Sequence, residues 1–256
     1  MKIALCQLQI QYECKEENLK TAEGYIKEAS DQKVDLILFP EMSFTGFSMN
    51  TLKTGEEQME TVNVMKQLAE KYQVAIGFGW VKHQKNCENH YTVVDASGKT
   101  LGDYIKIHPF SFAGEDEVFT KGQAISFFQY QGMTFGITIC YDLRFPELYQ
   151  RLSEEADAII VAANWPKVRV AQWDALLQAR AIENQSYILG VNCTGTQEDT
   201  VYSGHGKVIA PDGTVVLDLK EDAGMHIMDL DNDVQVYREK FPMKQDRRKA
   251  FYKNFY

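Results

Sequence analysis

Short apolar segments alternate along the chain with segments whose apolar residues follow helical spacing. The helical spacing predicts helices in residues 15–33, 58–71, 146–155 and 171–184. Apolar runs and two-residue alternation predict a hairpin over 206–219 and strands in residues 2–9, 35–39, 74–81, 91–95, 100–107, 125–131, 134–139, 158–163, 187–192 and 224–229. This order of elements predicts an α/β protein.

Two kinds of connection define the expected sheets. The segments DLILF and DAIIVAA are apolar after their first residue, which is typical of strands buried on both faces. The turn sequences ASGK, Gly132-Met133 and PDGT instead join neighbouring strands into hairpins. We therefore expect a mixed sheet or two packed sheets, with the helices outside. DLILFPE and DAIIVAANWP are also alike, which hints at pseudo-symmetry between the two halves.

Charge and hydropathy narrow the class of protein. The formal net charge is −9, and the one basic cluster, residues 247–249, is short, so we expect neither a nucleic acid nor an anionic membrane as a partner. We interpret that cluster as solvated surface. No segment approaches about 18 consecutive apolar residues, so we expect no membrane-spanning helix.

The cysteines indicate the redox state of the cellular compartment in which we expect the protein. Their odd number, wide spacing and lack of any CxxC pair are typical of free thiols. The N-terminal apolar run is interrupted by Gln7, Gln9 and Gln11, unlike the core of a signal peptide. We therefore expect a cytoplasmic protein.

Four polar or reactive side chains lie near the ends of predicted strands, namely Glu41, Lys106, Cys140 and Asn164. In α/β sheets, ligands meet the carboxyl ends of the strands. Glutamate, lysine and cysteine supply a base, a cation for a developing oxyanion and a nucleophile. Cys140 also precedes the predicted helix at Pro146, whose dipole we expect to lower the pKa of the thiol. Spacing alone leaves open whether these residues converge.

The segments LILFPEMSFTGF, YIKIHPF and ICYDLRFPELY resemble, in order, the three motifs of the nitrilase superfamily of carbon–nitrogen hydrolases. AANWP, WDALLQARAIENQSYILGVN, SGHGKVIAPDG and YREKFP resemble its amidase branch, in particular bacterial omega-amidases. The likeness covers roughly residues 2–242, so we expect one domain over 1–256 with a C-terminal tail at 243–256. The resemblance implies a four-layer α-β-β-α sandwich and a homodimer or higher homo-oligomer.

The resemblance also implies the catalytic residues. It carries the roles of general base, lysine and nucleophile onto Glu41, Lys106 and Cys140. The family has a second glutamate shortly after the lysine. For it, FAGEDEVF offers Glu115, with Asp116 and Glu117 as alternatives.

The expected reaction is hydrolysis of a small carboxylate-bearing amide, such as 2-oxoglutaramate, to an acid and ammonia through a cysteine thioester. The backbone N–H of Tyr141 would assist at the oxyanion. Arg144 either pairs with Asp142 or Glu147 or binds the remote carboxylate of the substrate, as an arginine just after the cysteine does in the resembling N-carbamoyl-amino-acid hydrolases. Trp165 follows a predicted strand and either lines the pocket or packs in the core.

Other functions stay open at this point. The same residues would serve a nitrilase or an N-carbamoyl-amino-acid hydrolase, and a non-catalytic binding protein is a remote alternative. His108 could pair with Cys140, although we interpret it as a loop residue that supports Lys106, and His205 as a turn residue. The sequence has no HExxH, ligand-spaced Cys/His cluster, Walker-type loop or GxSxG, so we expect no metal and no cofactor.

Overall fold

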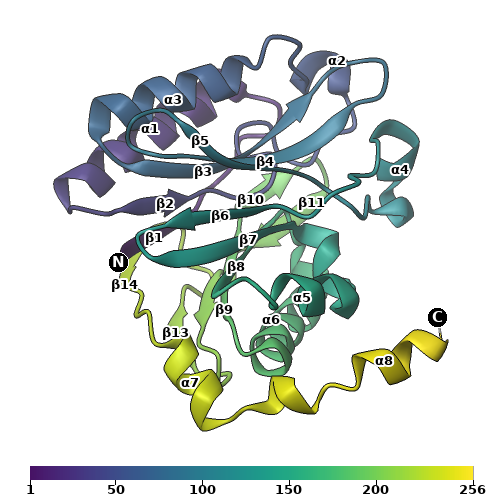
Figure 1. Cartoon of the computed structure of the whole chain (residues 1–256). Helices are drawn as coiled ribbons and strands as arrows, with labels where there is room; N and C mark the ends of the chain where they lie inside the picture. Colours follow the sequence, from purple (N-terminus) through teal and green to yellow (C-terminus); the bar gives the residue numbers. More distant parts are fainter. Residues whose placement is uncertain (256) are drawn as a thin grey trace.

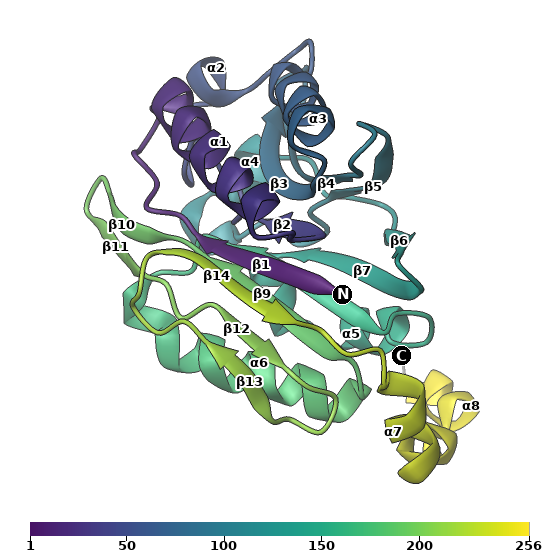
Figure 2. The same cartoon turned by 90° about the vertical axis from the view of Figure 1, so that its left-hand side faces the viewer.

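The computed structural model describes residues 1–255 and contains two six-stranded mixed sheets (Figure 1). The strand order is β14-β1-β2-β3-β4-β5 in the first sheet and β13-β12-β9-β8-β7-β6 in the second. The sheets stack on each other, and helices cover the outer face of each (Figure 2). The structure thus confirms the four-layer α-β-β-α sandwich.

The first sheet is parallel at its centre and antiparallel towards its edges. Its strands are β1 (Lys2–Gln7), β2 (Leu36–Leu38), β3 (Ala75–Lys82), β4 (Glu88–Val94), β5 (Thr100–Ile105) and β14 (Gly224–Asp229). β1, β2 and β3 run parallel, whereas β14 pairs antiparallel with β1. Helices α1 (Lys15–Asp31) and α3 (Glu60–Tyr72) cover its outer face.

The second sheet repeats this plan. Its strands are β6 (Phe127–Tyr130), β7 (Met133–Ile139), β8 (Ala158–Ala163), β9 (Tyr187–Asn192), β12 (Lys207–Ile209) and β13 (Val215–Asp218). β7, β8 and β9 run parallel, and helices α5 (Pro146–Leu152) and α6 (Val170–Asn184) cover the outer face. β2 and β8, which carry the two similar sequence segments, both lie between parallel neighbours.

The alternation of side chains along the strands builds two apolar cores. In β2, Leu36 and Leu38 point into the core between the sheets, whereas Ile37 points into the core beneath α1 and α3. Every residue of β8 is fully buried because this strand is covered on both faces. The wholly apolar segments of the sequence therefore mark the centres of the sheets, as predicted.

The structure differs from the predicted elements at a few places. The β6–β7 hairpin turns at Gln131 and Gly132, one residue earlier than predicted, since both have the positive φ that a two-residue turn requires. Six further elements were not predicted from the sequence. They are the hairpin of β10 (Thr194–Gln197) and β11 (Thr200–Ser203) and the helices α2 (Thr51–Thr54), α4 (Glu115–Val118), α7 (Val234–Lys240) and α8 (Lys249–Tyr252). The division into a core and a tail after residue 242 stays a prediction.

The basic cluster is not simply solvated surface. Arg247 donates hydrogen bonds to the backbone oxygen of Glu183 and to the Asn184 side chain, so it ties the C-terminal segment to α6. Within residues 1–255, no helix is long and apolar enough to cross a bilayer.

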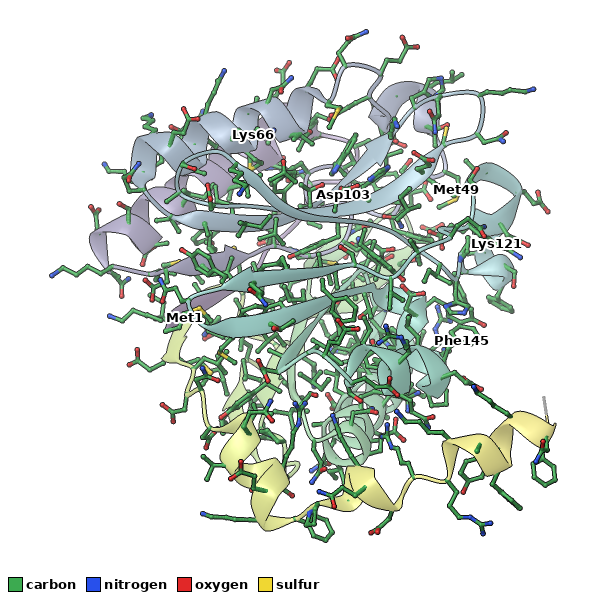
Figure 3. All side chains as sticks on the ribbon, in the orientation of Figure 1. Met1, Met49, Lys66, Asp103, Lys121 and Phe145 are labelled. Atoms are coloured by element: carbon green, nitrogen blue, oxygen red, sulfur yellow. The ribbon has the colours of Figure 1, made fainter. Side chains whose placement is uncertain are left out.

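The carboxyl ends of the parallel strands meet at one edge of the sandwich. β2 leads to Glu41, β7 to Cys140 and β8 to Asn164. In Figure 3, Met49 and Phe145 lie on the right-hand side of the view and Met1 on the left. Met49 lines the same cavity as Cys140, so the candidate site lies on the right-hand side of this view.

Candidate active site

A cluster of buried charges lies next to the ends of β2 and β5. The Lys106 Nζ lies 2.8 Å from Glu41 Oε1 and 2.8 Å from Glu115 Oε2. The Asn89 side-chain amide donates to both carboxylates, at 2.9 Å to Glu41 and 3.0 Å to Glu115. None of the four residues is more than 1% exposed. We call Glu41, Asn89, Lys106 and Glu115 the buried charge cluster.

The cluster fixes the protonation of its lysine. Burial by itself lowers the pKa of Lys106, but the adjacent Glu115 and Glu41 charges outweigh it and raise the pKa above its ordinary value. Burial raises the pKa of Glu115, with the Glu41 charge adding to this and the Lys106 charge opposing it. Lys106 is therefore an ammonium group at neutral pH. Asp116 and Glu117 are exposed, so Glu115 is the carboxylate of this acidic run that reaches Lys106.

The Glu41 carboxylate is also held from the opposite sheet. The Asn164 backbone N–H donates to Glu41 Oε2 at 2.9 Å, and the Asn164 side chain donates to the Glu41 backbone oxygen at 2.6 Å. The Glu41 loop also lies close to β3, because a Cβ on Gly79 would be 2.3 Å from the Met42 backbone nitrogen. A glycine at this position thus lets the loop approach the strand. The strands β2 and β8, whose sequence segments are alike, are therefore followed by two residues, Glu41 and Asn164, that hydrogen-bond to each other.

Cys140 occupies a sharp turn between β7 and the 3₁₀ turn η2 (Cys140–Arg144). Its φ of 47° is left-handed, a conformation that costs a non-glycine residue of order 1–2 kcal/mol. The Asp142 carboxylate holds this turn by accepting the Ile139 N–H at 3.0 Å, the Tyr104 hydroxyl at 2.8 Å, and both the backbone N–H and ring nitrogen of His108. The turn places Cys140 Sγ 3.8 Å from the Asn164 backbone oxygen.

The expected lowering of the Cys140 pKa is wrong. Burial raises the pKa of the Cys140 thiol well above its ordinary value, and the Glu41 charge and a hydrogen bond with Glu41 raise it further. The Lys106 charge lowers it but offsets only part of this rise. Helix α5 begins six residues later, at Pro146, so its dipole does not act directly at the sulfur. The resting group is a thiol, and it needs a base to become a nucleophile.

A cavity of about 520 Å³ opens in front of Cys140. Its lining includes Met49, which lies on the right-hand side of Figure 3, together with Tyr141, Arg144, Asn164 and Trp165. This volume lies within the usual range for small-molecule sites. Trp165 therefore lines the pocket, although it is only 3% exposed.

Arg144 pairs with neither Asp142 nor Glu147. Its guanidinium donates to the Gln172 side chain at 2.5 Å and lies over the Trp165 ring, 4.8 Å from the centroid. Within residues 1–255 it forms no ion pair, and Asp142 instead pairs with His108 and accepts the Tyr104 hydroxyl. The described residues thus show neither expected ion pair, and the Arg144 guanidinium lines the cavity without a carboxylate partner. Binding of a substrate carboxylate stays a prediction.

The two histidine alternatives lie elsewhere. The His108 ring bonds Asp142 at 2.7 Å and stacks on Phe145, 3.7 Å between centroids, so it supports the turn below Cys140. His205 has a φ of 61° and is a turn residue, as predicted, with its ring 3.4 Å from Asp174. Residues 1–255 contain no group of three or more His, Cys, Asp or Glu side chains that could hold a metal ion.

The whole chain resembles proteins of one family. A family profile described as carbon-nitrogen hydrolase matches residues 2–239. The chain belongs to the carbon–nitrogen hydrolase family. The 2-oxoglutaramate amidase of Bacillus subtilis is 32% identical over 98% of each chain. An omega-amidase of Escherichia coli strain K12 is 33% identical over 83% of this chain and 84% of its own.

Solved structures show the same fold. A protein of the superfamily from Xanthomonas campestris superposes with a TM-score of 0.91 at 24% identity, covering 96% of this chain and 97% of its own. Nit3 of Saccharomyces cerevisiae, a member of branch 10 of the nitrilase superfamily, superposes with a TM-score of 0.87 at 25% identity, covering 97% and 96%. This carbon–nitrogen hydrolase therefore has the nitrilase fold, and family and relatives indicate an amidase-type hydrolase.

Two residues that hold the site of this hydrolase, Asn89 and Gln197, were not predicted from its sequence. Asn89 gave no motif. The hairpin register counted from the ASGK turn would place it opposite Ile105, and a β-bulge at Val93 and Val94 moves it to Lys106, whose backbone N–H donates to the Asn89 oxygen at 2.9 Å. Gln197 lies in the unpredicted β10–β11 hairpin. Its side chain donates to Asn164 Oδ1 at 2.9 Å and accepts the Phe47 N–H at 2.8 Å. Gln197 therefore links the Glu41 loop to the end of β8.

Proposed function

We propose that this hydrolase is an omega-amidase that cleaves the terminal amide of a short dicarboxylate monoamide, such as 2-oxoglutaramate, and releases ammonia. The observation that carries the proposal is the unpaired Arg144 guanidinium in the same cavity as Cys140. An arginine fork suits a carboxylate, which it binds with two parallel hydrogen bonds. The names of the relatives from Bacillus subtilis and Escherichia coli support this choice.

The proposed first step is acylation of Cys140. The sulfur attacks the amide carbon while Glu41 takes the thiol proton, since the thiol is protonated at rest. The S–C bond forms and the carbonyl oxygen becomes an oxyanion. Glu41 then gives its proton to the amide nitrogen, the C–N bond breaks, and ammonia departs from a thioester.

In this scheme, Lys106 and the backbone N–H of Tyr141 stabilise the oxyanion. Lys106 has three N–H donors, which face Glu41 Oε1 and the two oxygens of Glu115. In the proposed scheme the longest of these contacts, 3.0 Å to Glu115 Oε1, is exchanged for the substrate oxygen. Tyr141 lies at the start of η2, where backbone N–H groups have no intrahelical acceptor. A fixed ammonium and a fixed N–H lower the energy of the developing charge without reorganising.

Water completes the proposed cycle. Glu41, now ionised again, takes a proton from water as its oxygen attacks the thioester carbon. The S–C bond breaks, and the proton returns to Cys140. Glu115 is a positioning residue in this scheme, because both its oxygens face Lys106 and one also accepts the Phe110 N–H at 2.5 Å.

Ammonia release from three matched compound classes tests the proposal. Short omega-amides such as glutaramate should be turned over, whereas nitriles and N-carbamoyl amino acids should give little ammonia. A thioester should be trapped with glutaramate by acid quench and mass spectrometry, on the peptide that contains Cys140. Preference for a nitrile or a ureido acid would assign the site to those branches, and no adduct with any class would favour a binding protein. The homodimer or higher homo-oligomer stays a prediction that light scattering tests.

A further inference from the structure

Arg144 is not the only arginine in the cavity without a carboxylate partner. Arg169 ends the 3₁₀ turn η3 (Lys167–Arg169) and lines the same cavity. Its guanidinium lies over the Phe110 ring, 5.2 Å from the centroid. Within the described part of the chain it forms no ion pair, although its neighbour Lys167 pairs with Glu221 at 2.9 Å.

The two arginines lie against one set of aromatic rings. Arg144 lies over Trp165 and over Tyr141, whose ring centroid is 4.8 Å from that of Phe110. The Trp165 indole N–H donates to the Arg169 backbone oxygen at 2.8 Å. Phe110, Tyr141, Arg144, Trp165 and Arg169 thus form one side of the cavity, which we call the arginine wall.

The acidic residues of the cavity do not neutralise this wall. Glu13 pairs with Lys53 at 3.0 Å and accepts a hydrogen bond from Ser48 at 2.6 Å. Glu198 is exposed at the tip of the β10–β11 hairpin. Two guanidinium groups near one cavity repel each other, and an anion between or beside them offsets this repulsion. Stacking on aromatic rings uses the faces of the guanidinium groups, so the N–H groups at their edges, apart from the Arg144 N–H that donates to Gln172, can bind such an anion.

We propose that Arg169 is a second specificity-determining residue, which binds the remote carboxylate of the substrate together with Arg144. The inference rests on the proposed omega-amidase function and narrows it to anionic amides held by two guanidinium groups. The carboxylate has two oxygens with room for four hydrogen bonds, so it can accept donors from both arginines.

The test compares glutaramate with pentanamide, a neutral amide of the same carbon number. Arg169→Gln should raise KM for glutaramate about tenfold or more, because charge-assisted hydrogen bonds are lost, and should change KM for pentanamide less than twofold. Lys167→Gln is the matched control: it removes a charge from the same turn but does not line the cavity. It should leave both KM values unchanged. Equal losses for the two amides, or no loss, would overturn the role of Arg169.

Direct binding separates this inference from the proposed function. Calorimetry with the Cys140→Ala protein should show tighter binding of glutaramate than of pentanamide, and adding Arg169→Gln should remove most of the difference. No preference for glutaramate before Arg169 is changed overturns both proposals. A preference that Arg144→Lys reduces and Arg169→Gln does not overturns only the second. If Arg169→Gln unfolds on a thermal melt, Arg169→Lys replaces it and should give a smaller, still selective, loss.

Discussion

The buried charge cluster and the arginine wall both hold cations at the candidate site, but they differ in how deeply the cations are buried and in which groups contact them. Lys106 is fully buried and contacts two carboxylates, whereas Arg144 and Arg169 are half-buried and contact aromatic rings. A fully buried charge is stable only if a partner of opposite charge lies inside the protein. A half-buried charge is partly solvated, so its partner can be a ligand that binds from solution. The cluster should therefore govern kcat and stability, and the wall should govern KM.

Loss of the nucleophile should have the largest effect. Cys140→Ala should reduce kcat on the order of 10⁶-fold, the size seen when a hydrolase loses its nucleophile, and leave the fold intact. Ammonia release and the far-UV circular dichroism spectrum measure the two effects. Cys14→Ala, at an exposed thiol, is the control and should remain fully active. Normal turnover by Cys140→Ala would refute the proposed mechanism.

Loss of the base should come next. Glu41→Gln keeps the shape of the side chain but cannot accept the thiol proton, so kcat should fall by about 10²–10⁴-fold. His108→Asn should cost much less, since the His108 ring bonds Asp142 rather than Cys140. Steady-state kinetics of the two variants decide the matter, and the reverse ranking would favour a Cys–His pair.

Loss of the cluster's cation should affect stability as well as activity. Lys106→Met leaves two buried carboxylates without a counter-charge, which should cost about 3–5 kcal/mol in the free energy of unfolding. The loss should shrink as the pH falls, because the carboxylates can then take up protons. Urea unfolding at several pH values measures this. Lys71→Met, which breaks an exposed pair with Glu23, should change stability little; a similar loss there would show that burial is not the cause.

The raised pKa of Cys140 should make the resting enzyme slow to react with alkylating agents. Burial and the Glu41 charge keep the sulfur protonated, so its reaction with iodoacetamide at pH 7 should be slow and should accelerate as the pH rises above 9. Mass spectrometry of the peptide that contains Cys140 gives the rate. Rapid modification at pH 7 would instead support the lowered Cys140 pKa that the sequence predicted.

The wall should give the smallest and most selective change. Arg144→Lys keeps the charge but loses the fork, so KM for glutaramate should rise several-fold while KM for pentanamide hardly changes. The kinetic constants for both amides measure this. Equal changes would assign Arg144 to holding the η2 turn.

Sequence patterns predicted an α/β protein with a mixed sheet or two packed sheets, because the central strands are apolar on both faces. The four-layer sandwich itself was implied by the resemblance, whose motifs are contiguous in the sequence. Cys140 directly follows β7 and Glu41 follows β2 by three residues, so both could be placed near strand ends, whereas their roles were implied by the resemblance. The partners of the site were harder to find. Asn89 lies within a strand, and Gln197 lies in a short polar hairpin, so neither has a local signal. The Cys140 pKa was predicted in the wrong direction because burial and the Glu41 charge arise only when distant segments meet.

The pairing of β1 with β14 has a consequence for synthesis on the ribosome. β1 is made well before β14, yet the two strands are neighbours in the sheet, so that Lys2 pairs with Asp229. Until residues 224–229 leave the ribosome, one edge of β1 has no strand to cover its backbone N–H and C=O groups. An open edge of this kind can pair with another nascent chain. Completion of the first sheet, and with it protection of this edge from aggregation, must therefore wait for the synthesis of β14.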